Sequence, residues 1–321
     1  MLDMPAEDTQ KSVRAFAPAT IANVGPGFDC LGFALGGIGD AVELTVVDNP
    51  HKRKRVTIEV RGDDGRLPTK PAKNCASAVA LAMLDEAEAD FGVNILLGKG
   101  MPIGSGLGSS AASSAAAAVA MNELLDNQFE PEELVRFAAL GEEVACGTPH
   151  LDNVAPAVLG GFVLVRHSRT IQAITLDTPD WWVGVCRPQI ELPTRQARAA
   201  LPKQVSLHDL TCNVSNSAAM MVALMSGDLE LFGRSLMADV VVERCRAELI
   251  NHYDLVRQAA LEAGAAGVTI AGAGPSVFAV AADRAEARTV GEAMAAVWLS
   301  LGIDSDVYVS RFGDQGARLA E

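Results

Sequence analysis

The sequence has little that favours binding to nucleic acid or to a membrane. Its 321 residues include 26 Lys and Arg against 40 Asp and Glu, so the formal net charge of −14 opposes contact with phosphate backbones and anionic lipid. The longest apolar runs, such as residues 218–225, fall far short of the ~18 residues of a membrane span. The first residues also lack an apolar signal core. We therefore expect a soluble cytoplasmic protein without nucleic-acid or membrane partners.

Cysteine and aromatic residues are also few. The six cysteines are widely spaced and include no C-x-x-C pair, so nothing indicates a zinc framework or a dense disulfide scaffold. We expect reduced and mostly buried thiols. Aromatic residues make up only 5% of the chain, so an aromatic cage around a ligand is not expected.

Length and composition favour two packed cores. The chain is about twice the ~150 residues of a typical domain, and 49% of its residues are hydrophobic. Apolar patterning predicts strands at 13–21, 41–47, 55–60, 93–97, 162–166, 181–186 and 305–309, and helices at 74–90, 131–146, 194–200, 206–225, 228–238, 250–263 and 284–301. Because short βαβ units do not repeat, we predict an α+β fold with two layers per domain and a boundary near residue 175. The basic cluster at 51–55 is interpreted as a solvated hairpin tip.

The most unusual segment is 101–125, where a glycine-marked loop leads into an alanine-rich helix. Gly104, Gly106 and Gly108 lie in the loop, and seven of the ten residues from Ala111 to Ala120 are alanine. Such a junction exposes unpaired backbone N–H groups at the positive end of a helix, and glycine lets a ligand approach closely. We interpret it as a phosphate-binding loop, although its spacing matches neither the P-loop nor G-x-G-x-x-G. A purely structural turn is the alternative.

Polar residues that need partners follow this segment. The predicted helix at 131–146 has Pro131 in its first turn and an apolar stripe formed by Leu134, Phe137, Ala138, Gly141 and Ala145. At ~100° per residue, Glu142 falls at the edge of the stripe and faces the interior, whereas Glu143 points away. His150, Asp152 and Asn153 then crowd a predicted loop before the strand at 162–166.

Three segments together resemble the GHMP kinases, a superfamily named for galactokinase, homoserine kinase, mevalonate kinase and phosphomevalonate kinase. They are APATIANVGPGFDCLGFAL (17–35), MPIGSGLGSSAA (101–112) and TIAGAGPSVFAV (269–280). Within the superfamily, the first segment and PHLDNVAPAVLGG (149–161) resemble the homoserine kinases in particular. The resemblance implies a two-domain α+β GHMP kinase fold. Its N-terminal domain, over 1–175, would be ribosomal-protein-S5-domain-2-like and bind ATP, and its C-terminal domain, over 176–321, would be a ferredoxin-like α/β sandwich.

The same resemblance implies an activity and its cofactors. ATP would donate its γ-phosphoryl group to the hydroxyl of L-homoserine, with Mg²⁺ between the phosphates, and the chain would form a homodimer. Glu142 matches the family's metal-ligating glutamate, and the hydroxyl of Ser109 or Ser110, with Ser110 assigned, would lie near the metal. Asn74 matches an adenine-binding position. The phosphates would contact Pro102, Ile103, Gly104, Ser105, Gly106, Leu107, Gly108, Ser109, Ser110, Ala111 and Ala112.

The implied substrate site combines acidic and basic groups. Arginine suits a carboxylate because its planar fork donates two parallel hydrogen bonds. By match to the family, the amino-acid site would be formed by Asn23, Asp29, His150, Asp152, Asn153, Thr194, Arg198, Arg246 and Gly274. Asn153 and Asp152 are also catalytic candidates, and whether Asp152 acts as a base or only binds substrate stays open. Arg244 is an alternative to Arg246 for the substrate carboxylate.

Two other functions remain open. One is a kinase of the same fold that acts on mevalonate or shikimate, which is less favoured because a site of acidic groups and arginines suits an ammonium-bearing substrate. The other is a non-catalytic sensor of ATP and a metabolite. Glu142 and the complete serine loop argue against a sensor, which does not require a metal ligand.

Overall fold

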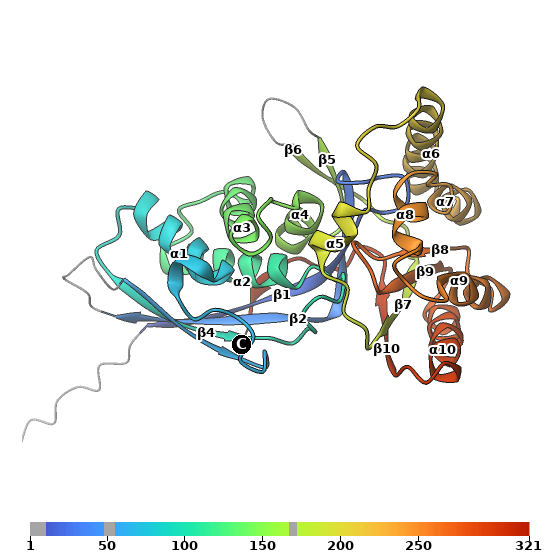
Figure 1. Ribbon diagram of the computed structural model, residues 1–321. Helices are drawn as coiled ribbons and strands as arrows, with labels where there is room; N and C mark the ends of the chain where they lie inside the picture. The colour runs from blue at the N-terminus through green and yellow to red at the C-terminus, as the bar shows by residue number, and fades with distance from the viewer. Residues whose placement is uncertain (1–10, 48–54, 167–171, 321) are drawn as a thin grey trace, which may run out of the picture.

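The computed structural model describes residues 11–47, 55–166 and 172–320 (Figure 1), so residues 51–54 of the basic cluster lie outside the described part. The strands are β1 (Ser12–Ala22), β2 (Leu31–Val47), β3 (Val56–Arg61), β4 (Gly92–Gly98), β5 (Phe162–Arg166), β6 (Gln172–Leu176), β7 (Trp182–Pro188), β8 (Gly267–Ile270), β9 (Val277–Ala281), β10 (Ser305–Arg311) and β11 (Arg318–Leu319). The helices are α1 (Cys75–Glu86), α2 (Ser109–Leu124), α3 (Pro131–Cys146), α4 (Leu151–Leu159), α5 (Thr194–Ala199), α6 (Leu207–Ser226), α7 (Leu229–Leu236), α8 (Val242–Ala247), α9 (Tyr253–Glu262) and α10 (Arg284–Ser300), with a short 3₁₀ helix at Pro71–Lys73. The α+β prediction is confirmed.

The first sheet has seven strands within the described residues, along the path β11–β1–β2–β4–β3, with β5 and β6 continuing from β2. Helices α1 to α4 cover one of its faces (Figure 1). Strand β2 is 17 residues long, whereas the sequence pattern predicted only its second half at 41–47. Gly32, Gly36, Gly37 and Gly39 occupy the first half, and glycine weakens the strand pattern that a sequence reading depends on.

In the part of the chain that the structure describes, the second sheet has four strands in the order β10–β7–β9–β8, all paired antiparallel. Helix α10 packs against β7, β9 and β10. The strands of the first sheet run to Leu176 and those of the second begin at Trp182, except that β11 returns to pair with β1. The division into 1–175 and 176–321 stays a prediction.

A cluster of aromatic side chains joins the two sheets. The ring of Phe33 on β2 lies 4.5 Å from that of Phe312 and 5.6 Å from that of Phe278 on β9, measured between centroids. Trp181 and Phe232 also pack against Phe312. Burying rings of this size contributes roughly 2–3 kcal/mol each, so the shared core holds the two sheets in a defined relation and positions the cleft between them.

The alanine-rich helix α2 lies among the helices that cover the first sheet. Its alanines at 111, 112, 115–118 and 120 are fully buried, and it contacts α1, α3, β1 and β2. Alanine loses no side-chain entropy in a helix and lets neighbouring backbones approach closely. The composition therefore explains both why the segment is helical and how it fits between a sheet and two helices.

Three sequence expectations are wrong. The segment after His150, predicted to be a loop, forms helix α4. Pro156 lies inside this helix and does not end it. A proline inside a helix is uncommon, so the sequence pattern favoured a loop. Ala145 is exposed and faces a cavity, not the core. Among the cysteines, all free of disulfides, only Cys75 and Cys186 are buried, and Cys146 is exposed.

One other expectation agrees with the structure. Glu142 is buried and Glu143 is exposed, as the helical pattern predicted. Among the helices of the described residues, none has the length and apolar character to cross a membrane.

Candidate active site

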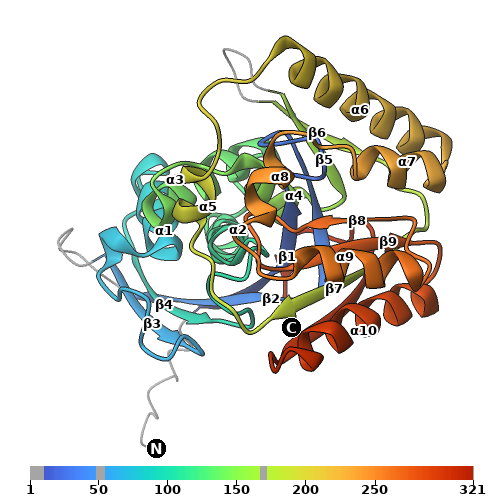
Figure 2. The same cartoon turned by 45° about the vertical axis from the view of Figure 1, so that its right-hand side comes forward.

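A cavity of about 940 Å³ is lined by residues from the start of α2, the end of α3 and the start of α4, and from α5 and α8. Figure 2 shows how α2, α4, α5 and α8 approach one another. Most of the residues predicted from the sequence to bind phosphate, metal or substrate line the cavity. They include Asn23, Asn74, Ile103, Gly104, Ser105, Gly106, Gly108, Ser109, Ser110, Glu142, His150, Asn153, Thr194, Arg198 and Arg246. The cavity therefore brings together segments that lie at opposite ends of the chain.

The loop before α2 has the backbone that an anion site requires. Gly106 and Gly108 adopt left-handed conformations with φ of 79° and 68°, which other residues rarely adopt. A Cβ atom on Gly106 would lie 2.7 Å from the carbonyl oxygens of Ala271 and Gly274, and one on Gly108 would lie 2.0 Å from Thr20 Oγ1. Within the described residues no side chain caps α2, because its N-cap is Gly108. Its first amides therefore remain available to a bound anion.

A buried lysine supports this loop from below. Lys99, which directly follows β4, forms an ion pair with Asp40 and donates to Ser113 Oγ at 2.9 Å. It also donates to Ser109 Oγ at 2.6 Å and to the Ser109 carbonyl at 3.1 Å. The hydroxyl of Ser109 is therefore already hydrogen-bonded to Lys99, which leaves Ser110 as the better metal candidate of the two. The sequence reading missed Lys99 because it precedes the glycines, whereas the P-loop lysine follows them.

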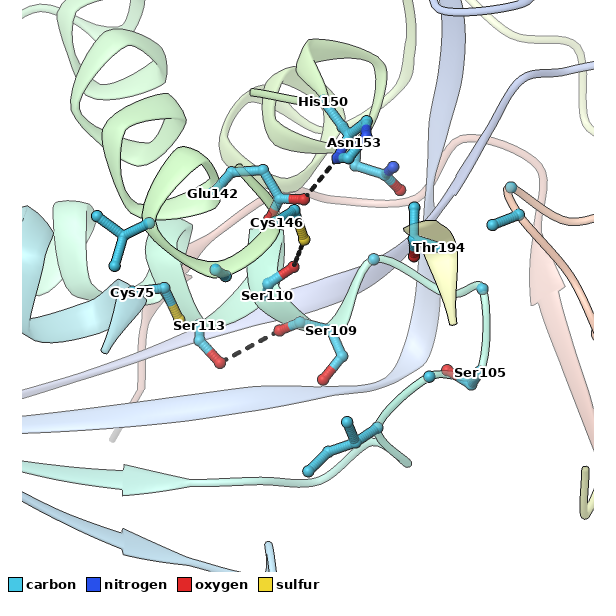
Figure 3. Close-up of a pocket in the computed structure, with 18 of the residues that line it drawn as sticks. Cys75, Ser105, Ser109, Ser110, Ser113, Glu142, Cys146, His150, Asn153 and Thr194 are labelled. Carbon is cyan, nitrogen blue, oxygen red and sulfur yellow. Dashed lines mark hydrogen bonds and ion pairs between the residues drawn. The ribbon is translucent and has the colours of Figure 1, made fainter. Parts of the chain in front are cut away.

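Glu142 reaches the cavity from the last turn of α3. Its side chain is buried, and His150 Nδ1 lies 2.9 Å from its Oε1 (Figure 3). The hydrogen bond to Glu142 raises the pKa of His150. The other carboxylate oxygen, Oε2, is buried and has no hydrogen-bond partner among the described residues. A buried carboxylate oxygen without a donor is energetically unfavourable, so its place beside a phosphate loop fits a bound cation.

Two arginines line the opposite side of the cavity, and one of them pairs with an aspartate. Arg198 donates from Nη2 to Asp29 Oδ1 at 2.7 Å and from Nη1 to Oδ2 at 3.1 Å. Arg246 is buried and donates to the Gly272 carbonyl at 2.6 Å. Burial, followed by the charge of Arg198, lowers the pKa of Arg246. Both guanidinium groups lie near the ring of Phe28, at 5.3 and 5.4 Å. Two close guanidinium groups favour the binding of a carboxylate.

The remaining polar residues hold one another in place. The backbone N–H of Asn23 donates to Asp152 Oδ2 at 3.2 Å, and its side-chain Oδ1 accepts from the N–H of Asp29 at 3.0 Å. Thr20 donates to Asn153 Oδ1 at 2.8 Å and so fixes the orientation of that amide. Burial, followed by the charge of Asp29, raises the pKa of Asp152 to about 6. Thr20 carried no signal in the sequence.

Some predicted residues have structural partners or lie outside the cavity lining. Asn74 accepts from the N–H of Ala76 as the cap of α1 and donates to the Pro68 carbonyl, so both of its polar groups have structural partners. Gly274 lies behind Gly106, and Gly272 and Ala273 line the cavity instead. Other predicted residues are also absent from the cavity lining, namely Pro102, Leu107, Ala111, Ala112, Asp29 and Asp152. Leu67, Pro68, Ala72 and Lys73 line it without having been predicted.

We predict that Asp152→Asn stabilises the fold at neutral and alkaline pH. The folded-state pKa of about 6 exceeds the ordinary 3.8, so the ionised carboxylate destabilises the folded state once the pH rises through this range. The variant should gain about 1–3 kcal/mol of unfolding free energy at pH 8. Denaturant unfolding at pH 8 and at pH 3.5 measures the difference, which should disappear at the lower pH. An equal gain at both pH values would contradict ionisation of Asp152 as its cause.

Comparisons with known proteins agree with this arrangement. Residues 74–161 match the family described as "GHMP kinases N terminal domain", and residues 220–299 match "GHMP kinases C terminal". A homoserine kinase of Chlorobium phaeobacteroides is 44% identical over 96% of this chain and 99% of its own length. One of Arabidopsis thaliana is 41% identical over 96% of this chain and 84% of its own. The crystal structure of homoserine kinase from Cytophaga hutchinsonii superposes with a TM-score of 0.93 at 42% identity, covering 99% of this chain and 100% of that one.

Proposed function

Because this chain belongs to the homoserine kinase family of the GHMP kinases, we propose that it phosphorylates the side-chain hydroxyl of L-homoserine with ATP. The observation that carries the proposal is that one cavity combines two ends with different binding chemistry. One end has uncapped helix amides beside a buried carboxylate oxygen that lacks a partner among the described residues. The other has an aspartate and two arginines, which together match a zwitterion.

At the phosphate end, the residues fit a magnesium ion held with ATP. Glu142 and Ser110 would hold the metal, which when bound neutralises charge between the β- and γ-phosphates. The amides that follow Gly108 would hold phosphate oxygens, and Lys99 keeps the first turn of α2 in position through Ser109. His150 orients Glu142 through the contact with Oε1, which leaves Oε2 free to ligate. His150, predicted from family position to bind substrate, is in this account a positioning residue.

At the amino-acid end, homoserine would separate an existing ion pair. Its carboxylate takes the place of Asp29 on Arg198, and its ammonium group takes the place of the guanidinium on Asp29. The side chains of Asp29 and Arg198 are 33% and 39% exposed, so a substrate can reach both. Arg246, beside the ring of Phe28, adds a second positive charge to this end of the cavity. The carboxylate of the substrate thus replaces the carboxylate of Asp29, and its ammonium group replaces the guanidinium group of Arg198.

We assign Asp152 mainly to binding the substrate, and only secondarily to accepting a proton. At pH 7 a group with a pKa of about 6 is mostly ionised, so it attracts the substrate's ammonium group. In a loose phosphoryl-transfer transition state the hydroxyl loses its proton late, and correct placement of the hydroxyl contributes most of the rate. Asn153, fixed by Thr20, would assist that placement.

The nucleobase would bind at the wall formed by Leu67, Pro68, Ala72 and Lys73. These residues precede Asn74 in the chain and line the same cavity as the phosphate loop. Asn74 would shape this wall by capping α1 with its side chain, and not by a side-chain contact with adenine.

The proposed function is tested by measuring ADP release with Mg-ATP and separate acceptors. We expect turnover with L-homoserine and none with mevalonate or shikimate, which lack an ammonium group. A ³¹P NMR spectrum of the product should show a phosphomonoester. Turnover that favours mevalonate or shikimate would support the other kinases of this fold, and nucleotide binding without turnover on any acceptor would support a sensor.

We predict that Arg246, and not Arg244, binds the substrate carboxylate. Arg246 is buried and lines the cavity, whereas Arg244, on the same helix α8, is exposed. Lysine keeps the charge but loses the fork, so Arg246→Lys should raise the KM for homoserine about tenfold. Arg244→Lys is the matched control and should leave it unchanged. The opposite result would assign the carboxylate to Arg244.

We also propose a homodimer that buries the exposed face of α6. Leu207, Val214 and Met225 on this helix are 81%, 59% and 82% exposed, and they share one face with Leu210 and Val222. Apolar side chains gathered in this way commonly mark an interface. Light scattering after size-exclusion chromatography should give twice the chain mass of 33.5 kDa, and Met225→Glu should reduce it toward the monomer. A monomeric wild-type protein would contradict this proposal.

A further inference from the structure

The end of helix α3 carries three metal-ligand side chains whose chemistry the kinase mechanism does not require together. Glu142, Cys146 and His150 each offer one ligand atom, and these atoms lie within 4.8 Å of one another. In a tetrahedral zinc site with bonds of about 2.0–2.3 Å, two ligand atoms are about 3.3–3.8 Å apart. Side-chain movements on the order of 1 Å therefore bring all three onto one ion.

The backbone explains why these side chains meet. Glu142 and Cys146 are four residues apart in the last turn of α3, so they share a face of the helix. Gly147 ends the helix in the left-handed conformation, and the chain turns back so that His150 begins α4. Cys146 Sγ points toward Ser110 Oγ, 3.7 Å away, and His150 Nδ1 contacts Glu142 (Figure 3).

The buried carboxylate of Glu142 favours a cation at this position. Glu142 is 3% exposed, and its Oε2 is buried without a hydrogen-bond partner in the part of the chain that the structure describes. His150 already contacts Oε1, and Thr148 Oγ1 lies 3.5 Å from the other ring nitrogen of His150. The unsatisfied atom therefore belongs to the same three-residue group.

We propose that Zn²⁺ binds Glu142, Cys146 and His150 and thereby inhibits the enzyme. Thiolate, imidazole and carboxylate are the ligands that zinc accepts, whereas Mg²⁺ prefers an all-oxygen octahedron. On binding, the thiol proton and any proton on the coordinating imidazole nitrogen pass to solvent. Glu142 is shared with the proposed magnesium site, so the two ions exclude each other. The inhibition rests on the proposed function, but the binding of zinc does not.

Metal binding is tested on the full-length, nucleotide-free protein with Co²⁺ as a spectroscopic probe. We expect a thiolate-to-cobalt charge-transfer band at one equivalent, which Zn²⁺ displaces. Cys146→Ser should abolish the band and weaken Zn²⁺ binding at least about tenfold. Cys146→Ala tests the same ligand again, since alanine favours the helix at this exposed position.

Cys212→Ser is the matched control. Cys212 Sγ lies 3.7 Å from His208 Nε2, so it also pairs a thiol with a histidine one helical turn away. Within the described residues this pair lacks a third ligand of the kind that Glu142 supplies. The control should therefore keep the band and the affinity for Zn²⁺. A band that persists in Cys146→Ser, or one that is lost in Cys212→Ser, overturns the proposed site.

Inhibition is tested with Mg-ATP, L-homoserine and buffered free Zn²⁺. The wild-type protein and Cys212→Ser should be inhibited alike, and Cys146→Ser should need at least about tenfold more Zn²⁺ for the same fractional loss of its own activity. Equal sensitivity of all three proteins overturns inhibition through this site. A protein without homoserine kinase activity would refute the proposed function, and the cobalt band would still decide whether the metal site exists.

Discussion

Glu142→Gln is expected to reduce kcat at least about 10²–10³-fold while leaving the affinity for homoserine nearly unchanged. Glutamine keeps the size of the side chain but loses the charge that holds the metal. Because the metal acts on charge that develops between the phosphates, its loss affects the transition state more than the binding of the amino acid. Initial-rate kinetics and isothermal titration with homoserine measure the two quantities separately.

Glu143→Gln is the matched control, because it makes the same chemical change one residue further along the same helix. Glu143 is exposed and does not line the cavity, so kcat should remain at the wild-type value. The assignment of Glu142 as metal ligand fails if the two variants turn over equally fast, or if Glu142→Gln changes only the KM for homoserine.

Arg198→Ala is expected to raise the KM for homoserine about 30- to 300-fold, with a much smaller change in kcat. Arg198 makes two charge-assisted hydrogen bonds to Asp29 that the substrate carboxylate would take over, and hydrogen bonds to charged groups contribute about 1.5–3 kcal/mol. A contact formed equally in the ground state and the transition state affects KM and not kcat.

Arg234→Ala removes the same charge at a residue that does not line the cavity. Its i,i+4 ion pair with Glu230 is exposed, and such pairs contribute only about 0.3–0.5 kcal/mol. Both kinetic constants should stay at their wild-type values. An unchanged homoserine KM in Arg198→Ala would place the substrate carboxylate elsewhere in the cavity.

The parts of the site that depend on local pattern could be predicted from the sequence. The glycine loop and alanine helix indicate an uncapped helix terminus, and helical spacing alone turns Glu142 inward. The structure confirms both positions. The roles of these residues in phosphate and metal binding stay predictions, because burial and geometry do not by themselves reveal a ligand.

Contacts between distant segments could not be predicted in this way. Lys99 and Asp40 are 59 residues apart, Thr20 and Asn153 are 133 apart, and Arg198 and Asp29 are 169 apart. No periodic pattern links such positions, because strand pairing within a sheet and the packing of distant segments bring them together. The exposure of Cys146 was missed for a related reason. The last turn of α3 extends past its neighbours into the cavity, where a residue of the apolar stripe such as Ala145 loses its core contacts.

In the proposed enzyme, phosphates bind at the start of α2 and face an amino acid held by Arg198. A crystal structure with Mg²⁺, a non-hydrolysable ATP analogue and L-homoserine tests this arrangement most directly. We predict phosphate oxygens on the amides after Gly108, the metal on Ser110 and Glu142, and the homoserine hydroxyl directed at the γ-phosphate. A triphosphate bound in another part of the protein, with this loop empty, would contradict the account.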